Sequence, residues 1–199
     1  GQWVLKSVCH QLKIWEQQPS KAHLHLAVNV SARQFLQAEF VEQITDILNE
    51  ASINPARITL ELTESMVLSN ITEAVSKMQA LKKLGIKFAI DDFGTGHSSL
   101  SSLQKLPLDQ LKIDQSFIHD IADNHDGVII VQTIIAMANN LGMEVFAEGV
   151  ETQAQKDFLI KHHCLNFQGF LFGEPMPLIK FEQTFESWAT IPPDESLSA

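Results

Sequence analysis

The chain has 199 residues, and its 24 Asp and Glu residues against 14 Lys and Arg residues give a formal net charge of −10. This length suits one domain, and a hydrophobic content of 45% argues against a disordered chain. The acidic balance excludes a general nucleic-acid coat, so neither DNA nor RNA is expected as a partner.

The cysteine content and the hydropathy of the chain indicate the compartment in which it works. The two distant cysteines, Cys9 and Cys164, fit neither a zinc finger nor a disulfide framework, which favours a reducing compartment. No apolar run reaches the roughly 20 residues of a membrane-spanning helix, and the chain does not begin with a signal-peptide pattern. We therefore predict a cytoplasmic domain that makes no membrane contact itself, within a parent protein that could be tethered to a membrane.

Short apolar segments alternate with amphipathic segments, in the order expected for parallel βαβ units. The predicted strands are His23–Val30, Arg57–Leu62, Ile86–Ile90, Gln110–Ile113, Glu144–Ala147 and Leu165–Phe167. The predicted helices are Trp3–Gln17, Phe40–Ala51, Ile71–Leu84, Gly127–Leu141 and Thr152–His162. Several strands are apolar on both faces, as parallel strands covered by helices should be. We expect an α/β domain over residues 1–189 and a tail over residues 190–199.

A polar residue follows or ends almost every predicted strand. These residues are Asn29, Glu61, Asp91 with Asp92, Lys112 with Asp114, Glu148 and Gln168. Their separation is close to one βα unit of about 30 residues. In a (β/α)₈ barrel the carboxyl ends of the strands converge on the face that carries the active site. Any one of these residues could simply end a strand, but the full set predicts a site.

The residue types at these strand ends favour divalent cations. Converging carboxylates need positive charge to neutralise them, and oxygen ligands without Cys or His suit Mg²⁺ or Mn²⁺. Asp91 and Asp92, at the end of one strand, could serve two ions, an arrangement suited to in-line attack on a phosphodiester. The glycine-rich loop that follows contains Gly94 and Gly96, which leave backbone amides free to meet an anion.

Together these residues resemble the EAL domain family, the bacterial cyclic-di-GMP phosphodiesterases. The resemblance rests on six ordered motifs: Asn29–Phe35 (NVSARQF), Glu61–Glu64 (ELTE), Asp91–Leu100 (DDFGTGHSSL), Leu111–Asp114 (LKID), Glu148–Glu151 (EGVE) and Gln168–Phe170 (QGF). His97 stands where Tyr or Phe is usual. The Glu-Ala-Leu motif that names the family is absent, so the chain is expected to begin after the family's first two strands and first helix. The resemblance implies a TIM-like (β/α)₈ barrel, here truncated at its N-terminus to about six βα units.

The resemblance also implies a reaction, in which a water activated by two Mg²⁺ or Mn²⁺ ions opens cyclic-di-GMP to linear pGpG. The implied metal ligands are Asn29, Glu61, Asp91, Asp92 and Glu148. Lys112 would steady the water or the charge that develops on the phosphate, and Glu148 is the candidate general base. A further family ligand lies in the absent motif, which leaves open whether this chain alone turns over substrate.

Other residues are implied as substrate contacts or supports. The implied substrate-binding residues are Arg33, Asp114 and Gln168. The implied loop supports are Glu64, Gly94, Thr95, Gly96 and Glu151. A homodimer is expected, and the parent protein is expected to carry sensory or GGDEF-type domains.

Two other functions remain open. The first is a catalytically inactive module that binds cyclic-di-GMP or another protein, and ligand binding without turnover would indicate it. The second is an enolase-like barrel that uses Mg²⁺ and Lys112 to abstract a proton beside a carboxylate, which the Asp91–Asp92 pair and the glycine-rich loop fit poorly. Asp92-Phe93-Gly94 also spells a kinase metal-binding triplet, but no other kinase motif accompanies it.

Overall fold

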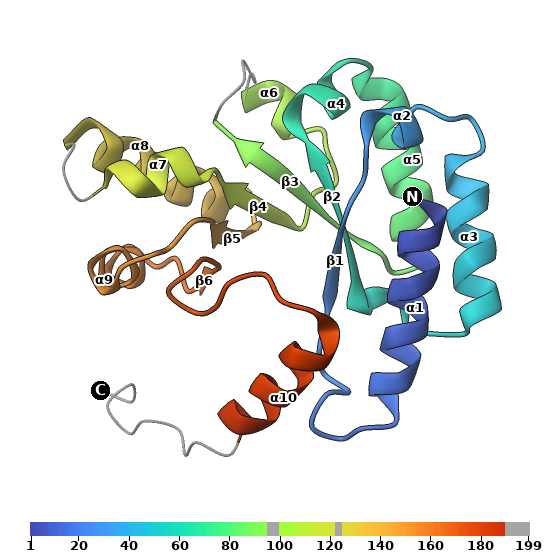
Figure 1. Ribbon diagram of the computed structural model, residues 1–199. Coiled ribbons are helices and arrows are strands. Elements are labelled where there is room, and N and C mark those ends of the chain that lie inside the picture. Colours follow the sequence, from blue (N-terminus) through green and yellow to red (C-terminus); the bar gives the residue numbers. More distant parts are fainter. Residues whose placement is uncertain (95–99, 122–124, 190–199) are drawn as a thin grey trace.

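The computed structural model describes residues 1–94, 100–121 and 125–189. Its centre is one parallel sheet in which each strand pairs with the next along the chain (Figure 1). The six strands are β1 (Leu26–Asn29), β2 (Ile58–Thr63), β3 (Lys87–Phe93), β4 (Gln110–Ile113), β5 (Glu144–Ala147) and β6 (Asn166–Phe167). This sequential order is the one found in a βα barrel, and the predicted α/β class with six parallel strands is confirmed.

Helices cover the outside of the curved sheet, with α1, α3 and α5 on the side of β1–β3 and α7, α8 and α9 on the side of β4–β6 (Figure 1). The longer helices are α1 (Gln2–Glu16), α3 (Phe40–Ala51), α5 (Ile71–Lys82), α8 (His125–Asn140), α9 (Gln153–Lys161) and α10 (Leu178–Ala189). The shorter ones are α2 (Ala32–Phe35), η1 (Pro55–Arg57), α4 (Glu64–Leu68), α6 (Leu100–Leu103) and α7 (Gln115–Asp120). Among the helices described, none combines the length and apolar character that crossing a membrane requires.

The first strand is shorter than the predicted His23–Val30, because the chain before it is held in turns. The Arg57 guanidinium is buried and donates hydrogen bonds to the backbone carbonyls of Leu24 at 2.9 Å, Leu12 at 3.2 Å and Lys21 at 3.4 Å. These bonds join the end of α1 to the segment that precedes β1. Pairing with β2 therefore begins only at Leu26.

The C-terminal helix α10, which the sequence analysis did not predict, packs against α1 and the turn after it. Trp15 Nε1 donates to Glu182 Oε1 at 2.7 Å, and the rings of Trp15 and Phe181 lie 5.9 Å apart. The buried ammonium of Lys21 forms an ion pair with Glu186 at 2.7 Å. Because α10 follows β6 and α1 precedes β1, these contacts bridge the two edges of the sheet.

Residues 190–199, the predicted tail, lie outside the described residues.

Candidate active site

The strand register brings the predicted polar residues to one edge of the sheet. Asn29 lies in register with Glu61, and Asp91 lies in register with Thr63, two positions after Glu61. Residues in register on parallel strands leave the sheet on the same face, as do residues two positions apart on one strand. At the other side of the sheet, Glu148 and Gln168 directly follow the paired ends of β5 and β6.

An irregularity in β3 allows both Asp91 and Asp92 to contribute. These two residues oppose the single residue Lys112 of β4, which is the pattern of a β-bulge. Asp92 has a φ of 52°, a left-handed conformation that Asp adopts more readily than most residues. Successive side chains of a regular strand point to opposite faces, but here carboxylate oxygens of Asp91, Asp92 and Glu148 all lie within 4.8 Å of one another.

Lys112 lies at the centre of this cluster. Its ammonium is 3.0 Å from Glu61 Oε1, 2.8 Å from Asp91 Oδ1 and 2.6 Å from Glu148 Oε1, and its side chain is 7% exposed. The ammonium is therefore within ion-pair distance of three carboxylates, which come from β2, from β3 and from the segment after β5. Gln168 Nε2 donates to the same Glu148 oxygen at 2.7 Å, which fixes this carboxylate from the side of β6.

One ammonium among four carboxylates leaves the cluster with excess negative charge. Burial raises the pKa of Glu61 and of Glu148, and the attraction of Lys112 does not cancel this effect because Asp91 adds repulsion. Burial alone would lower the pKa of Lys112, but the carboxylates of Asp91, Glu148 and Glu61 together outweigh burial and raise that pKa. Partial burial and the charge of Asp91 raise the pKa of Asp92. The oxygen donors and the excess negative charge fit Mg²⁺ or Mn²⁺, which Asp91, Asp92 and Glu148 would hold.

These raised pKa values predict that the metal-free protein loses stability as the pH rises. Glu61 and Glu148 bind protons more tightly in the folded than in the unfolded chain. Their stabilising contribution is therefore complete below the ordinary Glu pKa of 4.5 and is lost as the pH rises through their folded values. A divalent cation binds the ionised folded cluster and opposes this loss.

We expect Mg²⁺, at ten to thirty times its dissociation constant, to raise the free energy of unfolding by about 1–2 kcal/mol at pH 8 and by less at pH 5. Urea titrations with Mg²⁺ and with EDTA at both pH values measure this difference. An equal stabilisation at both pH values would contradict the assignment of the cluster as a cation site.

A cavity of about 870 Å³ adjoins the cluster, which is in the size range of small-molecule pockets. Five predicted site residues line it: Asp92, Asp114, Glu148, Glu151 and Gln168. Trp15, His25 and Phe181 also line it, as do the stacked rings of Phe167 and Phe172, whose centroids are 5.3 Å apart. The cavity lining therefore combines carboxylates with apolar and aromatic side chains, which suits a ligand with charged groups and flat rings.

The structure places two of the predicted residues away from these contacts. Asn29 is exposed beside Glu61, and Arg33 is exposed on α2; neither lines the cavity. Arg33 forms no hydrogen bond or ion pair with residues 1–94, 100–121 or 125–189. Asp114 lines the cavity and also caps α7, because its carboxylate accepts a hydrogen bond from the Ser116 amide at 3.0 Å.

The predicted loop supports are only partly described. Glu64 begins α4 and is 5% exposed, and its Oε1 has no hydrogen-bond partner within the described part of the chain. Gly94 has a φ of +101°, and a Cβ atom there would lie 2.7 Å from the ring of Phe117, so this position requires glycine. Thr95 and Gly96 lie outside the described residues.

Gln155, which was not among the predicted site residues, supports the segment after β5. Its Oε1 accepts hydrogen bonds from the amides of Glu151 at 2.8 Å and Thr152 at 2.9 Å, and its Nε2 donates to the Ile118 carbonyl at 3.2 Å. Gln155 thus ties the segment after Glu148 to α7 and α9. The Thr-x-x-Gln capping-box pattern of residues 152–155 was the available signal.

Comparison with known proteins agrees with this geometry. The sequence model of the EAL domain matches residues 1–175. The signaling protein YkoW of Bacillus subtilis is 43% identical over 92% of this chain, and the cyclic di-GMP phosphodiesterase NbdA of Pseudomonas aeruginosa is 39% identical over 98% of it. The chain spans about a quarter of the length of each of these two relatives.

Solved structures agree with the TIM-like barrel prediction. The phosphodiesterase MucR of Pseudomonas aeruginosa, in complex with cyclic-di-GMP, superposes with a TM-score of 0.87 and 40% identity over 91% of this chain and 73% of that one. The EAL domain of Mycobacterium smegmatis DcpA superposes with a TM-score of 0.87 and 36% identity over 94% of this chain and 84% of that one. With a family match over residues 1–175 and these barrel structures as relatives, the chain belongs to the EAL domain family.

Proposed function

We propose that this domain hydrolyses cyclic-di-GMP to linear pGpG. The observation that carries the proposal is the cluster in which Lys112 contacts Glu61, Asp91 and Glu148, the last of which lines a ligand-sized cavity. Support comes from NbdA, a cyclic di-GMP phosphodiesterase, and from the MucR complex with cyclic-di-GMP. The structure of BlrP1 from Klebsiella pneumoniae, 32% identical with a TM-score of 0.74 over 86% of this chain and 43% of that one, is a calcium and cyclic-di-GMP complex.

The proposed cofactors are two Mg²⁺ or Mn²⁺ ions. Asn29, Glu61 and Asp91 are the proposed ligands of one ion, and the proposed ligands of the other are Asp91, Asp92 and Glu148. When bound, the ions would activate a water and offset the charge of the phosphodiester. The bulge at Asp91 and Asp92 supports this arrangement, because it brings adjacent carboxylates to one side of β3.

The chain's own residues have distinct roles in the proposed reaction. The Glu148 carboxylate is the proposed acceptor of the proton of the attacking water. Gln168 holds that carboxylate in place. Lys112 is the proposed group that steadies the attacking water or the negative charge that develops on the phosphate in the transition state.

Other residues are proposed to bind substrate or to support the site. Arg33 and Asp114 are proposed substrate contacts, together with Gln168. Glu64 is the proposed support of the loop that contains Gly94, Thr95 and Gly96, and Glu151 supports the segment after β5. We further propose a cytoplasmic homodimer within a longer protein that carries sensory or GGDEF-type domains; the buried free thiols of Cys9 and Cys164 suit a reducing compartment.

The proposal is tested by incubating the chain with cyclic-di-GMP and Mg²⁺ or Mn²⁺ and separating the products by chromatography. We expect pGpG to form and its formation to stop when EDTA is added. Binding without turnover would instead indicate a receptor module. A folded chain that neither binds nor hydrolyses cyclic-di-GMP would contradict the proposal.

A further inference from the structure

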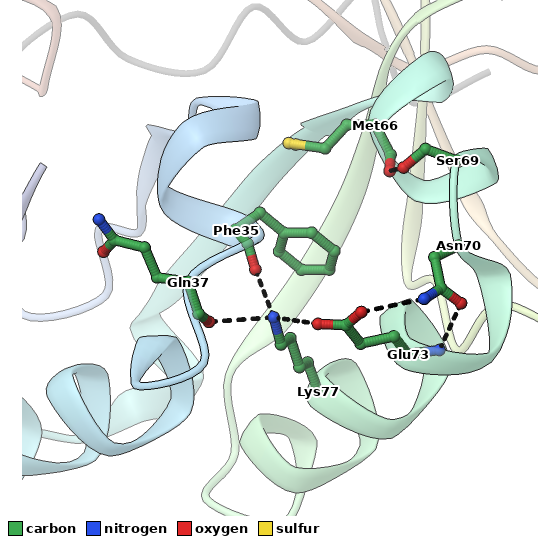
Figure 2. A network of polar contacts seen from close by, with 7 residues as sticks. All are labelled: Phe35, Gln37, Met66, Ser69, Asn70, Glu73 and Lys77. Atoms are coloured by element: carbon green, nitrogen blue, oxygen red, sulfur yellow. Dashed lines mark hydrogen bonds and ion pairs between the residues drawn. The ribbon is translucent and has the colours of Figure 1, made fainter.

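A buried lysine on α5, remote from the carboxylate cluster, makes three polar contacts at once. Lys77 is 8% exposed, and its Nζ lies 2.7 Å from the Phe35 carbonyl, 3.0 Å from the Gln37 carbonyl and 2.7 Å from Glu73 Oε1 (Figure 2). The ammonium has three protons, so each can meet one acceptor. The ammonium also lies 5.6 Å from the centroid of the Phe35 ring. Lys77 therefore binds the backbone around the end of α2.

Helix α2 depends on this contact for its placement. The helix has four residues, and a single turn is not stable by itself. Its N-terminal end is capped locally, by reciprocal hydrogen bonds between Ser31 and Gln34. At the C-terminal end, Lys77 donates hydrogen bonds to backbone carbonyl groups. It also places a positive charge there, which a helix C-terminus favours. The position of α2 is thus set by a side chain 42 residues away from Phe35 in sequence.

The acidic partner of Lys77 is itself held in place. Asn70 Nδ2 donates to Glu73 Oε2 at 3.0 Å, and the Glu73 amide donates to Asn70 Oδ1 at 3.3 Å (Figure 2). Just before Asn70, Ser69 Oγ donates to the Met66 carbonyl at 2.8 Å and closes the end of α4. This network joins α2 to the junction of α4 and α5.

Helix α2 matters for function because it contains Arg33, which follows the end of β1 closely in sequence. Arg33 is exposed, whereas Phe35 of the same turn is buried and packs its ring edge-on against Phe40 at 5.3 Å. We infer that Lys77 is a positioning residue for Arg33, holding α2 so that the guanidinium is presented to the phosphate or guanine of the substrate. This inference rests on the proposed function, because it assigns Arg33 the substrate contact described there.

The test compares Lys77→Met with Lys82→Met in steady-state hydrolysis of cyclic-di-GMP. We expect Lys77→Met to raise KM about tenfold with kcat changed less than about twofold, because a small displacement weakens binding while the carboxylate cluster stays intact. Lys82 lies on the same helix and forms an ion pair with Asp109 at 2.6 Å, away from α2, so its removal is the matched control. We expect the KM of Lys82→Met to equal that of the wild type.

A double-mutant cycle separates positioning from a general loss of structure. If Lys77 acts through Arg33, then Arg33→Ala raises KM, and adding Lys77→Met to Arg33→Ala raises it no further. Lys77→Arg keeps the charge and donors and is expected to restore part of the wild-type KM. Glu73→Gln keeps Lys77 and is expected to give a smaller rise in KM. If Lys77→Met fails to fold, Glu73→Gln is the variant that tests the inference.

The failure of this inference differs from that of the proposed function. A wild-type chain that hydrolyses cyclic-di-GMP while Lys77→Met and Glu73→Gln leave KM unchanged would overturn the inference alone. Equal effects of Lys77→Met on the wild-type chain and on the Arg33→Ala variant, or an Arg33→Ala chain with unchanged KM, would overturn it as well. A wild-type chain with neither binding nor turnover would overturn both.

Discussion

Replacing Glu148 with Gln is expected to lower kcat for cyclic-di-GMP by about 10³-fold or more, with the fold retained. The amide is nearly the same size, and its oxygen can still accept from Lys112 and Gln168, which lie 2.6 Å and 2.7 Å from Glu148 Oε1. The amide cannot, however, accept the proton of the attacking water, and it carries no charge for a cation. The proposed base and one proposed metal ligand are therefore lost in a single substitution.

The control for this variant is Glu144→Gln. Glu144 lies at the start of the same strand, β5, is exposed, and accepts a hydrogen bond from Gln110 Nε2 at 3.0 Å. We expect its kcat to stay within about twofold of the wild type. Initial rates of pGpG formation at saturating substrate, with a circular-dichroism check of folding, provide the measurement. A Glu148→Gln chain that kept a tenth of the wild-type rate would exclude Glu148 as the general base.

Replacing Lys112 with Met is expected to reduce kcat/KM by about 10²–10³-fold, the usual cost of losing one donor to a transition-state oxygen. The same change should destabilise the metal-free protein by about 3 kcal/mol at pH 8, because it leaves the buried carboxylates of Glu61, Asp91 and Glu148 without their cation. At pH 5 the loss should be smaller, since the raised pKa values of Glu61 and Glu148 rise further and protonation neutralises these groups.

Urea titrations in EDTA at pH 5 and pH 8 measure the stability effect of Lys112→Met, and Lys105→Met is its control. Lys105 is exposed in the turn before β4, so its loss should change neither stability nor rate. A destabilisation by Lys112→Met that is the same at both pH values would show that the lost contacts are packing contacts. In that case the electrostatic account of the cluster would be wrong.

Much of the fold follows from local pattern. The predicted bounds of Gln110–Ile113, Glu144–Ala147 and Phe40–Ala51 coincide with β4, β5 and α3, because their apolar residues recur with strand or helix period. Gly85 and Gly142, which follow the predicted helices Ile71–Leu84 and Gly127–Leu141, have φ angles of +105° and +74°, the left-handed conformation that ends many helices. Short helices such as α6 and α7 were missed, because one or two turns have too few residues for a periodic signal.

The candidate site could likewise be predicted from the sequence only in part. All the residues that meet around Lys112 were predicted from the sequence, because each ends or follows a strand and belongs to an ordered motif. The sequence alone, however, does not show how these residues contact one another. It could not show that Lys112 contacts Glu61, Asp91 and Glu148 together, because those contacts join three strands. Nor could it show the bulge that turns Asp92 toward Asp91, since strand period alone predicts that neighbouring side chains point to opposite faces.

Sequence alone determined the order of strands and helices, the family and the residue types of the site, because period, glycine position and motif spacing are properties of neighbouring residues. Only the tertiary structure shows that Glu182 of α10 contacts Trp15 of α1, and that the ammonium of Lys77 contacts the Phe35 carbonyl at the end of α2. These contacts connect residues 167 and 42 positions apart. Such pairs depend on the packing of the whole sheet and its helices, which no local pattern in the chain specifies.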